Sequence, residues 1–491
     1  MEVIARQSVK YSIIGYAGSL IGTLSLLFLF SRNFEFYGKL RNILTQAEFV
    51  VPFIVLGVSF SNVKFFSQTQ KEKKEHSLLS LSLISVLITF SVFFVGLHFA
   101  SREFPYIKNL KLWEYKFFTL PLILILSLSS VFNKFTSNYK RIAVANIFDN
   151  TFPKIANILA FSLFYFMCMP ESFSLSCFVL VFLLGLSGYI FYTRKLSSFR
   201  PDLSTHYFFG KGLWKEFLQY SFFAFLGTFG NYFTINNAVV GQFLGNEKLG
   251  IFSTYLGLLS LISIPQLGVY TVSAPLITRY LEDKEYLSLN VLYKTTSLSL
   301  FFLGVLMFSC MIAGIPYLFT LMKNGQMLHH HQFAFYIWGL AILVDLSTGF
   351  NSNIISLSEY YKFNILAMIA SSIMNIVLDL YFVYHTNYGL KGIAAATAVS
   401  LVFYNTIKVV FNYKKFGVFP FSIKMFWTLL LGILAVGIGF LIPEAPKPFL
   451  NLVYKPFFVL VFILLGNYFL KILPIQDFLN IKFLKSIMKF R

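Results

Sequence analysis

A single carboxylate stands in the middle of an apolar stretch of the sequence. Asp345 lies about midway along residues 333–355, a segment that is otherwise uncharged. A carboxylate at the centre of a membrane helix costs about 2.5 to 3.5 kcal/mol on insertion scales, so such groups usually face the interior of a helix bundle. The position is compatible with two roles: a site for a coupling proton or Na⁺, or a structural hydrogen bond to a neighbouring helix.

A polar stripe runs along residues 40–60. Arg41, Thr45, Glu48 and Pro52 recur at helical spacing, which places an arginine and a carboxylate on one face of a helix. Charged groups in membrane helices usually face a wet lumen rather than lipid, so this face is a candidate path for a polar substrate. In the alternative interpretation, Arg41 is an interfacial anchor and Glu48 is its intrahelical partner.

Two prolines mark candidate bends. Pro52 and Pro265 occupy matching positions in the two halves of the chain, and a proline inside a helix removes a backbone hydrogen bond. We predict gating roles for both, with packing alone as the alternative.

Further polar residues lie in or beside apolar segments. Amide side chains would bind hydroxyl groups, and Lys or Arg side chains would bind anionic groups. Snorkelling from the membrane interface is an equally good interpretation of Lys154. Asp379, one turn after Asn375, is predicted to be an interhelical or interfacial group. The further candidates along the path are Lys64, Lys154, Asn231, Asn236, Gln266 and Arg279.

The sequence contains no pattern typical of a metal, cofactor or ATP site. Residues 329–331 are three adjacent histidines on one short loop, and adjacent ligands seldom complete a coordination sphere. Cys168, Cys177 and Cys310 lack paired ligand spacing and are interpreted as buried small residues. There is no Gly-rich loop with Lys-Ser/Thr for ATP. We therefore predict no cofactor, no metal and no catalytic residue.

The composition is that of an all-α polytopic membrane protein. Of 491 residues, 57% are apolar, 19% aromatic and 12% charged, which excludes a set of soluble domains. The net charge of +20 does not indicate nucleic-acid binding, because no basic block with interleaved aromatics lies outside the apolar segments. A spanning helix needs about 20 apolar residues. About 14 spans are predicted, at residues 11–30, 40–60, 78–100, 117–131, 147–167, 173–192, 217–240, 249–272, 291–313, 333–355, 363–384, 393–411, 426–442 and 457–472.

The distribution of cations predicts the topology. With the N-terminus inside, most of the 40 Lys and Arg residues fall on the inner side, so both termini are predicted to be cytoplasmic. Two predicted outer loops are exceptions to this rule. The cations of these loops either have a specific role on the outer side of the membrane or snorkel from a lumen. They are Arg32, Lys39 and Arg41 in the first loop and Arg102, Lys108, Lys111 and Lys116 in the second.

The two halves of the chain repeat one another. Tyr37-Gly38 matches Leu249-Gly250, and Pro52 matches Pro265. Because each half would hold six spans, both halves enter the membrane with the same polarity, as in the parallel repeats of alternating-access transporters. The predicted organisation is an N-lobe at 1–195, a cytoplasmic connector at 196–216, a C-lobe at 217–415, two further spans at 416–473 and a basic interfacial tail at 474–491.

Several strings, taken together in order, resemble a known family over nearly the whole chain. They are residues 6–11, 37–38, 64–66, 273–277 and 345–351, and they are similar to a bacterial Wzx-type oligosaccharide flippase of the multidrug/oligosaccharidyl-lipid/polysaccharide exporter superfamily. The resemblance implies a non-enzymatic flippase in the bacterial inner membrane that carries undecaprenyl-diphosphate-linked oligosaccharide for O-antigen, capsule or exopolysaccharide synthesis. Its implied partners are the lipid-linked oligosaccharide, H⁺ or Na⁺, membrane lipids and the polysaccharide polymerase machinery.

The resemblance also sets expectations for the path. Cations are expected in the central cavity, but the middles of spans 217–240 and 249–272 contain no Arg or Lys, which leaves as edge candidates Arg41, Lys64, Lys154 and Arg279. The polyprenyl tail stays in the bilayer, so a lateral gate is expected beside the first or eighth span. The small residues that favour the first span are Gly15, Gly18 and Gly22.

Three other functions were weighed against the flippase. A MATE-type cation/drug antiporter would share the lobes but usually stops at twelve spans. A flippase for a peptidoglycan lipid precursor is a nearer alternative that the sequence separates poorly. A membrane-embedded polymerase or glycosyltransferase would usually show a long outer loop or an interfacial carboxylate cluster, and neither is present in the sequence.

Overall fold

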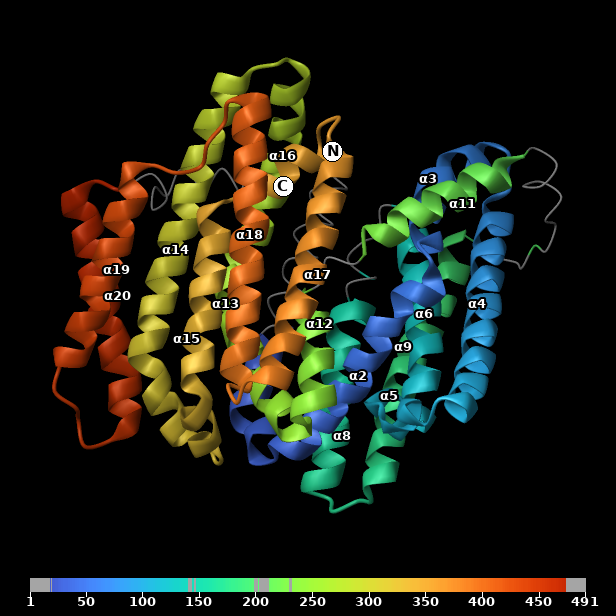
Figure 1. Ribbon diagram of the computed structural model, residues 1–491, viewed down its shortest axis with the longest axis horizontal. Helices are drawn as coiled ribbons and strands as arrows, with labels where there is room; N and C mark the ends of the chain where they lie inside the picture. The colour runs from blue at the N-terminus through green and yellow to red at the C-terminus, as the bar shows by residue number, and fades with distance from the viewer. Residues whose placement is uncertain are drawn as a thin grey trace. The chain divides into compact units, whose positions relative to one another are not determined.

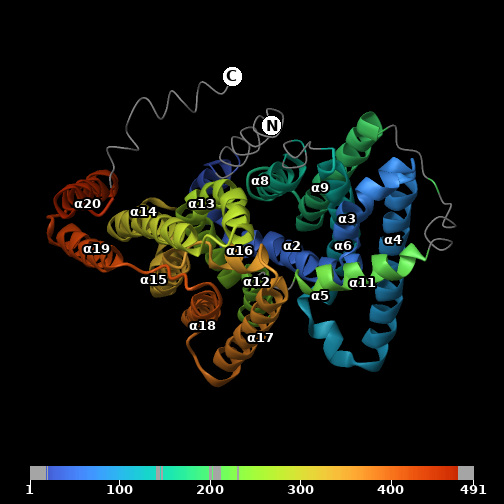
Figure 2. The ribbon, with the colours of Figure 1, turned by 90° about the horizontal axis from the view of Figure 1, so that it is seen from above.

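The computed structural model describes residues 18, 20–139, 144, 147–197, 202, 212–228 and 232–473, and every regular element among them is a helix (Figures 1 and 2). The chain divides into two compact units. Unit 1 comprises Met1–Leu258 and Met368–Ile393, and unit 2 comprises Leu259–Ala367 and Ala394–Arg491. These units do not follow the boundaries predicted for the lobes, because long helices run from one unit into the other; the lobe assignment stays a prediction.

The helices of unit 1 are η1 (Phe30–Arg32), α2 (Phe34–Val55), α3 (Val58–Lys71), α4 (Glu75–Glu103), η2 (Pro105–Asn109), α5 (Lys111–Glu114), α6 (Lys116–Ser137), η3 (Ile147–Thr151), α8 (Phe152–Tyr165), α9 (Glu171–Ser197), α11 (Leu213–Leu226), α12 (Tyr232–Val239) and η4 (Val240–Leu244). Three helices belong to both units, namely α13 (Asn246–Glu282), α17 (Tyr361–His385) and α18 (Leu390–Phe416). Unit 2 adds α14 (Tyr286–Leu321), α15 (Gly325–Ser347), α16 (Asn351–Ser356), α19 (Ile423–Leu441) and α20 (Pro448–Leu470).

The prediction of a polytopic all-α protein is confirmed. Among the described residues, nine helices are long and apolar enough to cross a membrane, and the bent pair α2 and α3 makes a tenth. The predicted span 11–30 lies largely outside the described residues, while span 217–240 is divided between α11 and α12, and span 333–355 between α15 and α16. The total of 14 therefore stays a prediction.

The break between α2 and α3 lies one turn after Pro52. The two helices meet at 46°, and the chain turns through left-handed conformations at Leu56 (φ 47°) and Gly57 (φ 74°). A Cβ on Gly57 would lie 2.0 Å from the carbonyl oxygen of Ser221 on α11. Glycine is therefore required twice over at this position, for its backbone conformation and for the close approach of α11.

A pair of glycines lets α2 and α13 cross closely inside unit 1. A Cβ on Gly38 would lie 1.7 Å from the carbonyl oxygen of Asn246, and a Cβ on Gly250 would lie 2.3 Å from the carbonyl oxygen of Phe34. Gly38 thus packs on Asn246, four positions before Gly250, and Gly250 packs on Phe34, four positions before Gly38. The contact is therefore reciprocal. Gly38 and Gly250 are the residues that the sequence comparison of the two halves aligned; the repeat itself stays a prediction.

Gly38→Ala is expected to lower the thermal unfolding temperature of the detergent-solubilised protein. The added methyl group overlaps backbone atoms of α13, which cannot move as a flexible side chain would. The matched control is Gly96→Ala on α4, where a Cβ meets nothing within 4 Å. Fluorescence-monitored melting of both variants tests this; equal unfolding temperatures would show that the crossing tolerates a wider separation.

The last two helices pack along α14 in unit 2. Figure 2 shows α19 and α20 beside α14, and glycines permit both contacts. A Cβ on Gly432 of α19 would lie 2.4 Å from Val305 Cγ1, and one on Gly314 of α14 would lie 2.9 Å from Pro456 Cγ. The predicted pair of extra spans is therefore an integral part of this unit's packing.

Candidate functional site

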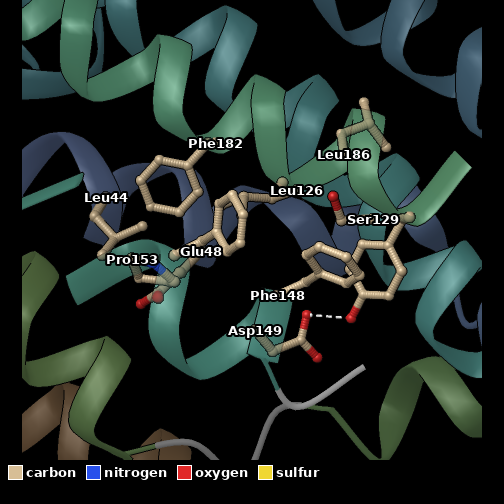
Figure 3. Close-up of a pocket in the computed structure, with 12 residues that line it drawn as sticks. Leu44, Glu48, Leu126, Ser129, Phe148, Asp149, Pro153, Phe182 and Leu186 are labelled. Carbon is tan, nitrogen blue, oxygen red and sulfur yellow. Dashed lines mark hydrogen bonds between the residues drawn. The ribbon is translucent and has the colours of Figure 1, made fainter. Parts of the chain in front are cut away.

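Unit 1 contains a cavity of about 200 Å³ with two carboxylates in its wall (Figure 3). Glu48 enters it from α2 and Asp149 from η3. The remaining wall is largely apolar and aromatic and comes from α2, η3, α6, α8 and α9, with Leu44, Leu126, Ser129, Phe148, Phe152, Pro153, Phe182, Gly185, Leu186 and Tyr189.

Asp149 is held in place by two donors. The Tyr189 hydroxyl donates to Asp149 Oδ1 at 2.7 Å, which is the dashed line in Figure 3, and Asn133 Nδ2 donates to Asp149 Oδ2. The carboxylate lies on a π-helical turn, Ile147–Thr151, that leads into α8 near Pro153. Such turns occur often at functional sites because they redirect one side chain out of the regular helical pattern.

Glu48 borders two cavities. Besides the first, it lines a second cavity of about 340 Å³ together with Pro52, Phe53 and apolar residues of α11, α12 and α17. Its side chain is exposed to these spaces, and no described residue donates a hydrogen bond to it or pairs with it within 4 Å. No Arg41–Glu48 contact within 4 Å is recorded among the described residues, but Arg41 acts electrostatically on Glu48, and the alternative that the two are intrahelical partners stays a prediction. Arg41 itself is half-buried, and its Nε has no hydrogen-bond partner.

Lys154 lies against Gly18 and the short apolar helix Leu20–Arg32. A Cβ on Gly18 would lie 2.8 Å from Lys154 Nζ, and one on Gly22 would lie 3.5 Å from Lys154 Cε. The described part of the predicted small-residue face thus makes room for a lysine side chain. Gly15 lies outside the described residues, and the lateral gate stays a prediction.

The other candidates of unit 1 lie apart from this cavity. Lys64 is exposed on α3, and its ammonium lies 4.5 Å from the centre of the Tyr220 ring on α11. Asn236 of α12 is fully buried and accepts a hydrogen bond of 2.6 Å from Asn375, which also donates to Asp379 at 2.8 Å. Asp379 is fully buried, consistent with the predicted interhelical environment. Asn231 lies outside the described residues.

Asp345 is the centre of a polar cluster in unit 2 that joins four helices. Its Oδ2 accepts from Gln266 Nε2 of α13 at 3.2 Å, and its Oδ1 accepts from Asn405 Nδ2 of α18 at 3.0 Å. Gln266 also donates to the Tyr270 hydroxyl at 2.6 Å, and Asn405 Oδ1 accepts from Asn351 Nδ2 of α16 at 2.8 Å. The structural role predicted for Asp345, a hydrogen bond to a neighbouring helix, is therefore present.

A buried lysine belongs to the same cluster. Lys408 is only 1% exposed, its Nζ donates to Ser352 Oγ at 2.8 Å, and it lies 3.4 Å from the centre of the Tyr404 ring. A charged lysine that is buried away from water needs a compensating charge nearby. Asp345 is the carboxylate that acts electrostatically on Lys408. The sequence analysis missed Lys408, although a lysine between Ile407 and Val409, inside a predicted span, was a signal that could have found it.

The other two candidates of unit 2, Arg279 and Pro265, lie outside this cluster. The side chain of Arg279, near the end of α13, is 70% exposed and forms an ion pair with Asp283 at 3.4 Å. This is an exposed ion pair rather than a buried anion site. Pro265 lies within the long helix α13, so among the described residues only Pro52 of the two prolines adjoins a helix break.

A sequence model of the polysaccharide biosynthesis protein family matches residues 11–281 of the 491. The chain belongs to this family. No curated protein matches the sequence significantly. Among solved structures, the chain is similar to "Lipid II flippase MurJ, inward closed conformation", with 17% identity and a TM-score of 0.69 over 94% of this chain and 99% of that chain.

The chain is also similar to a multidrug resistance MATE family transporter of the MOP superfamily. The inward-facing form gives 14% identity and a TM-score of 0.57 over 85% of this chain and 95% of that chain. The outward-facing form gives 13% identity and a TM-score of 0.53 over 84% and 96%. This member of the polysaccharide biosynthesis family therefore has a MOP-type transporter fold, and its relatives by fold are transporters and flippases rather than enzymes.

The arrangement brings together two chemically different clusters, one in each unit. In unit 1, two carboxylates, a serine hydroxyl and aromatic rings surround empty space, which suits a polar ligand with hydroxyl groups. In unit 2, the half-buried Asp345 and the buried Lys408 belong to one polar cluster, in which hydrogen bonds from amide side chains hold the carboxylate. Among the described residues, no group of three His, Cys, Asp or Glu side chains could hold a metal ion.

Proposed function

We propose that this protein moves an undecaprenyl-diphosphate-linked oligosaccharide from the inner to the outer leaflet of the bacterial cytoplasmic membrane by alternating access. The observation that carries the proposal is the cavity with Glu48 and Asp149 in a member of the polysaccharide biosynthesis family. Carboxylates accept hydrogen bonds from sugar hydroxyls, and the rings of Phe148 and Tyr189 offer flat faces to a sugar. The product would serve O-antigen, capsule or exopolysaccharide synthesis, and both termini would be cytoplasmic.

Cations of the same unit would serve the diphosphate. Arg41 Nε is buried without an acceptor, and a buried donor that lacks its partner is costly. No described residue accepts a hydrogen bond from Lys154 or forms an ion pair with it. An anionic phosphate that passes these side chains would supply the missing acceptors through charge-assisted hydrogen bonds.

The cluster around Asp345 would couple transport to an ion gradient. Protonation of Asp345, or its binding of Na⁺, would remove the negative charge that balances Lys408. The cluster would then relax by changing its interhelical hydrogen bonds, of which those to Gln266 and Asn405 reach two different helices. A transport cycle of this kind needs no ATP.

Glu48→Gln is expected to reduce flipping of the glycolipid about tenfold, because a hydrogen bond to a charged acceptor contributes about 1.5 to 3 kcal/mol. The protein would be reconstituted in liposomes without ATP, and movement of a lipid-linked oligosaccharide between leaflets would be followed by its accessibility to an added glycan-modifying reagent. Glu247→Gln, an exposed carboxylate at the start of α13, is the matched control. Equal rates for both variants would remove Glu48 from the substrate path.

The same assay would be run separately with two further candidate substrates. The fold of a lipid II flippase, matched over 99% of its chain, favours a peptidoglycan lipid precursor as the second candidate. A MATE-type function would appear as export of a lipid-free cationic dye. Movement of dye without movement of either glycolipid would overturn the proposed flippase.

A further inference from the structure

A groove of about 590 Å³ lies on unit 1, outside the two cavities already described. It runs between α4 and α6 and is lined by apolar side chains over most of its length, namely Phe90, Phe94, Leu97, Phe117, Leu120, Pro121 and Leu124. Phe94 is 50% exposed and Phe117 is 79% exposed, so the groove opens on the surface of the unit. Its volume is within the range of about 300 to 1,000 Å³ that is common for small-molecule sites.

Polar side chains of the groove gather at one end. His98, near the end of α4, and Lys116, the first residue of α6, are the two that can carry positive charge in its wall. Lys116 Nζ lies 3.9 Å from the centre of the Trp113 ring, a cation–π contact that fixes the ammonium at this end. No carboxylate lies in the groove wall, and among the described residues Lys116 has no acidic partner within 4 Å.

The segment that closes this end is held in place. The backbone amide of Lys111 donates to Gln242 Oε1 at 2.8 Å, and Gln242 Nε2 donates to the Asn109 carbonyl at 3.2 Å. Lys111 pairs with Glu114 at 2.6 Å, which neutralises one cation and leaves Lys116 available. The cationic end of the groove is therefore a defined feature rather than the tip of a loose loop.

We propose that this groove binds an anionic phospholipid of the bilayer, with its phosphate at Lys116 and His98 and one acyl chain along the apolar wall. An acyl chain needs an apolar trench, and a phosphate needs donors and positive charge at the end of that trench. A bilayer phospholipid is favoured over the polyprenyl carrier because the groove opens at the surface, where phospholipid surrounds every spanning helix.

The site also accounts for an exception in the charge pattern. Arg102, Lys108, Lys111 and Lys116 belong to a loop that is predicted to be external, where the positive-inside rule disfavours cations. A cation close to an anionic headgroup is stabilised by it electrostatically. A bound anionic lipid therefore gives Lys116, the one of these cations in the groove wall, a role on the side that is predicted to be external.

The test is lipid retention by the purified full-length protein. The protein would be equilibrated with equal amounts of phosphatidylglycerol and phosphatidylcholine of the same acyl chains, and the retained lipids would be counted by native mass spectrometry. We expect the wild type to retain phosphatidylglycerol preferentially and Lys116→Gln to lower that preference about fivefold. Lys447→Gln, an exposed lysine before α20 in the other unit, is the matched control and should keep the preference.

A second variant tests the apolar part of the groove. Leu124→Trp fills the trench and should reduce the retention of both lipids, while Lys116→Gln changes only the preference between them. An unchanged preference in Lys116→Gln would overturn the proposal. A polyprenyl phosphate in place of phosphatidylglycerol in the lipid extract of the purified protein would also overturn it. Neither readout depends on transport, so the result is separable from the test of the flippase.

Discussion

Asp345→Asn is expected to reduce ion-driven flipping of the lipid-linked oligosaccharide about 100-fold while the protein still folds. This factor is near the upper end of the usual range for coupling between two sites. Asparagine has nearly the same shape, so the bond from Asn405 to the side-chain oxygen can persist. It carries no charge and takes up no proton, so the balance with Lys408 can no longer be changed by an ion.

The measurement is flipping in liposomes with an imposed pH or Na⁺ gradient, at several pH values. Asp283→Asn is the control, since Asp283 is an exposed carboxylate of the same unit at the end of α13. Flipping by Asp345→Asn at the wild-type rate across the whole pH range would leave Asp345 with a structural role alone. Loss of flipping together with a large drop in the unfolding temperature would point to the same conclusion.

Lys408→Met is expected to destabilise the protein by about 1.5 to 3 kcal/mol, because it removes a charged hydrogen bond to Ser352 and the cation on which Asp345 acts. Methionine fills a similar volume, so the loss is electrostatic rather than a cavity. Without the ammonium, Asp345 keeps its two amide donors but loses the cation of its cluster. The unfolding temperature in detergent should therefore fall clearly.

The double variant separates charge balance from packing. Adding Asp345→Asn to Lys408→Met removes both charges and should recover part of the lost stability, because no unbalanced charge remains. Lys414→Met, an exposed lysine near the end of the same helix, is the control and should behave as the wild type. If the double variant is less stable than Lys408→Met by the full cost of Asp345→Asn alone, the two charges act independently.

The local pattern of the sequence determined most of the helices. Apolar runs of spanning length predicted α4, α9 and α14 without reference to any partner, because a membrane helix satisfies its backbone hydrogen bonds within itself. The same reasoning predicted a buried environment for Asp345, since an unpaired carboxylate is costly in lipid. The sequence also aligned Gly38 with Gly250, but it could not show that these glycines let α2 and α13 cross closely.

Partners between distant helices were decided by the tertiary structure. Helical periodicity places Arg41 and Glu48 on one stripe, but it cannot show that Glu48 instead faces two cavities while Arg41 Nε stays unpaired. It also cannot show that Asn133 and Tyr189, on two different helices, converge on Asp149.

The pairing of charges in unit 2 was likewise decided by the tertiary structure. Asp345 and Lys408 lie 63 positions apart in the sequence, and each alone is an unfavourable residue in an apolar helix. Periodicity fixes the direction of a side chain relative to its own helix axis, whereas the contacts of that side chain depend on how several helices pack together. The sequence by itself therefore determined the helices and the positions where charge enters the membrane, and only the packing of α13, α15, α16 and α18 decided which groups neutralise it.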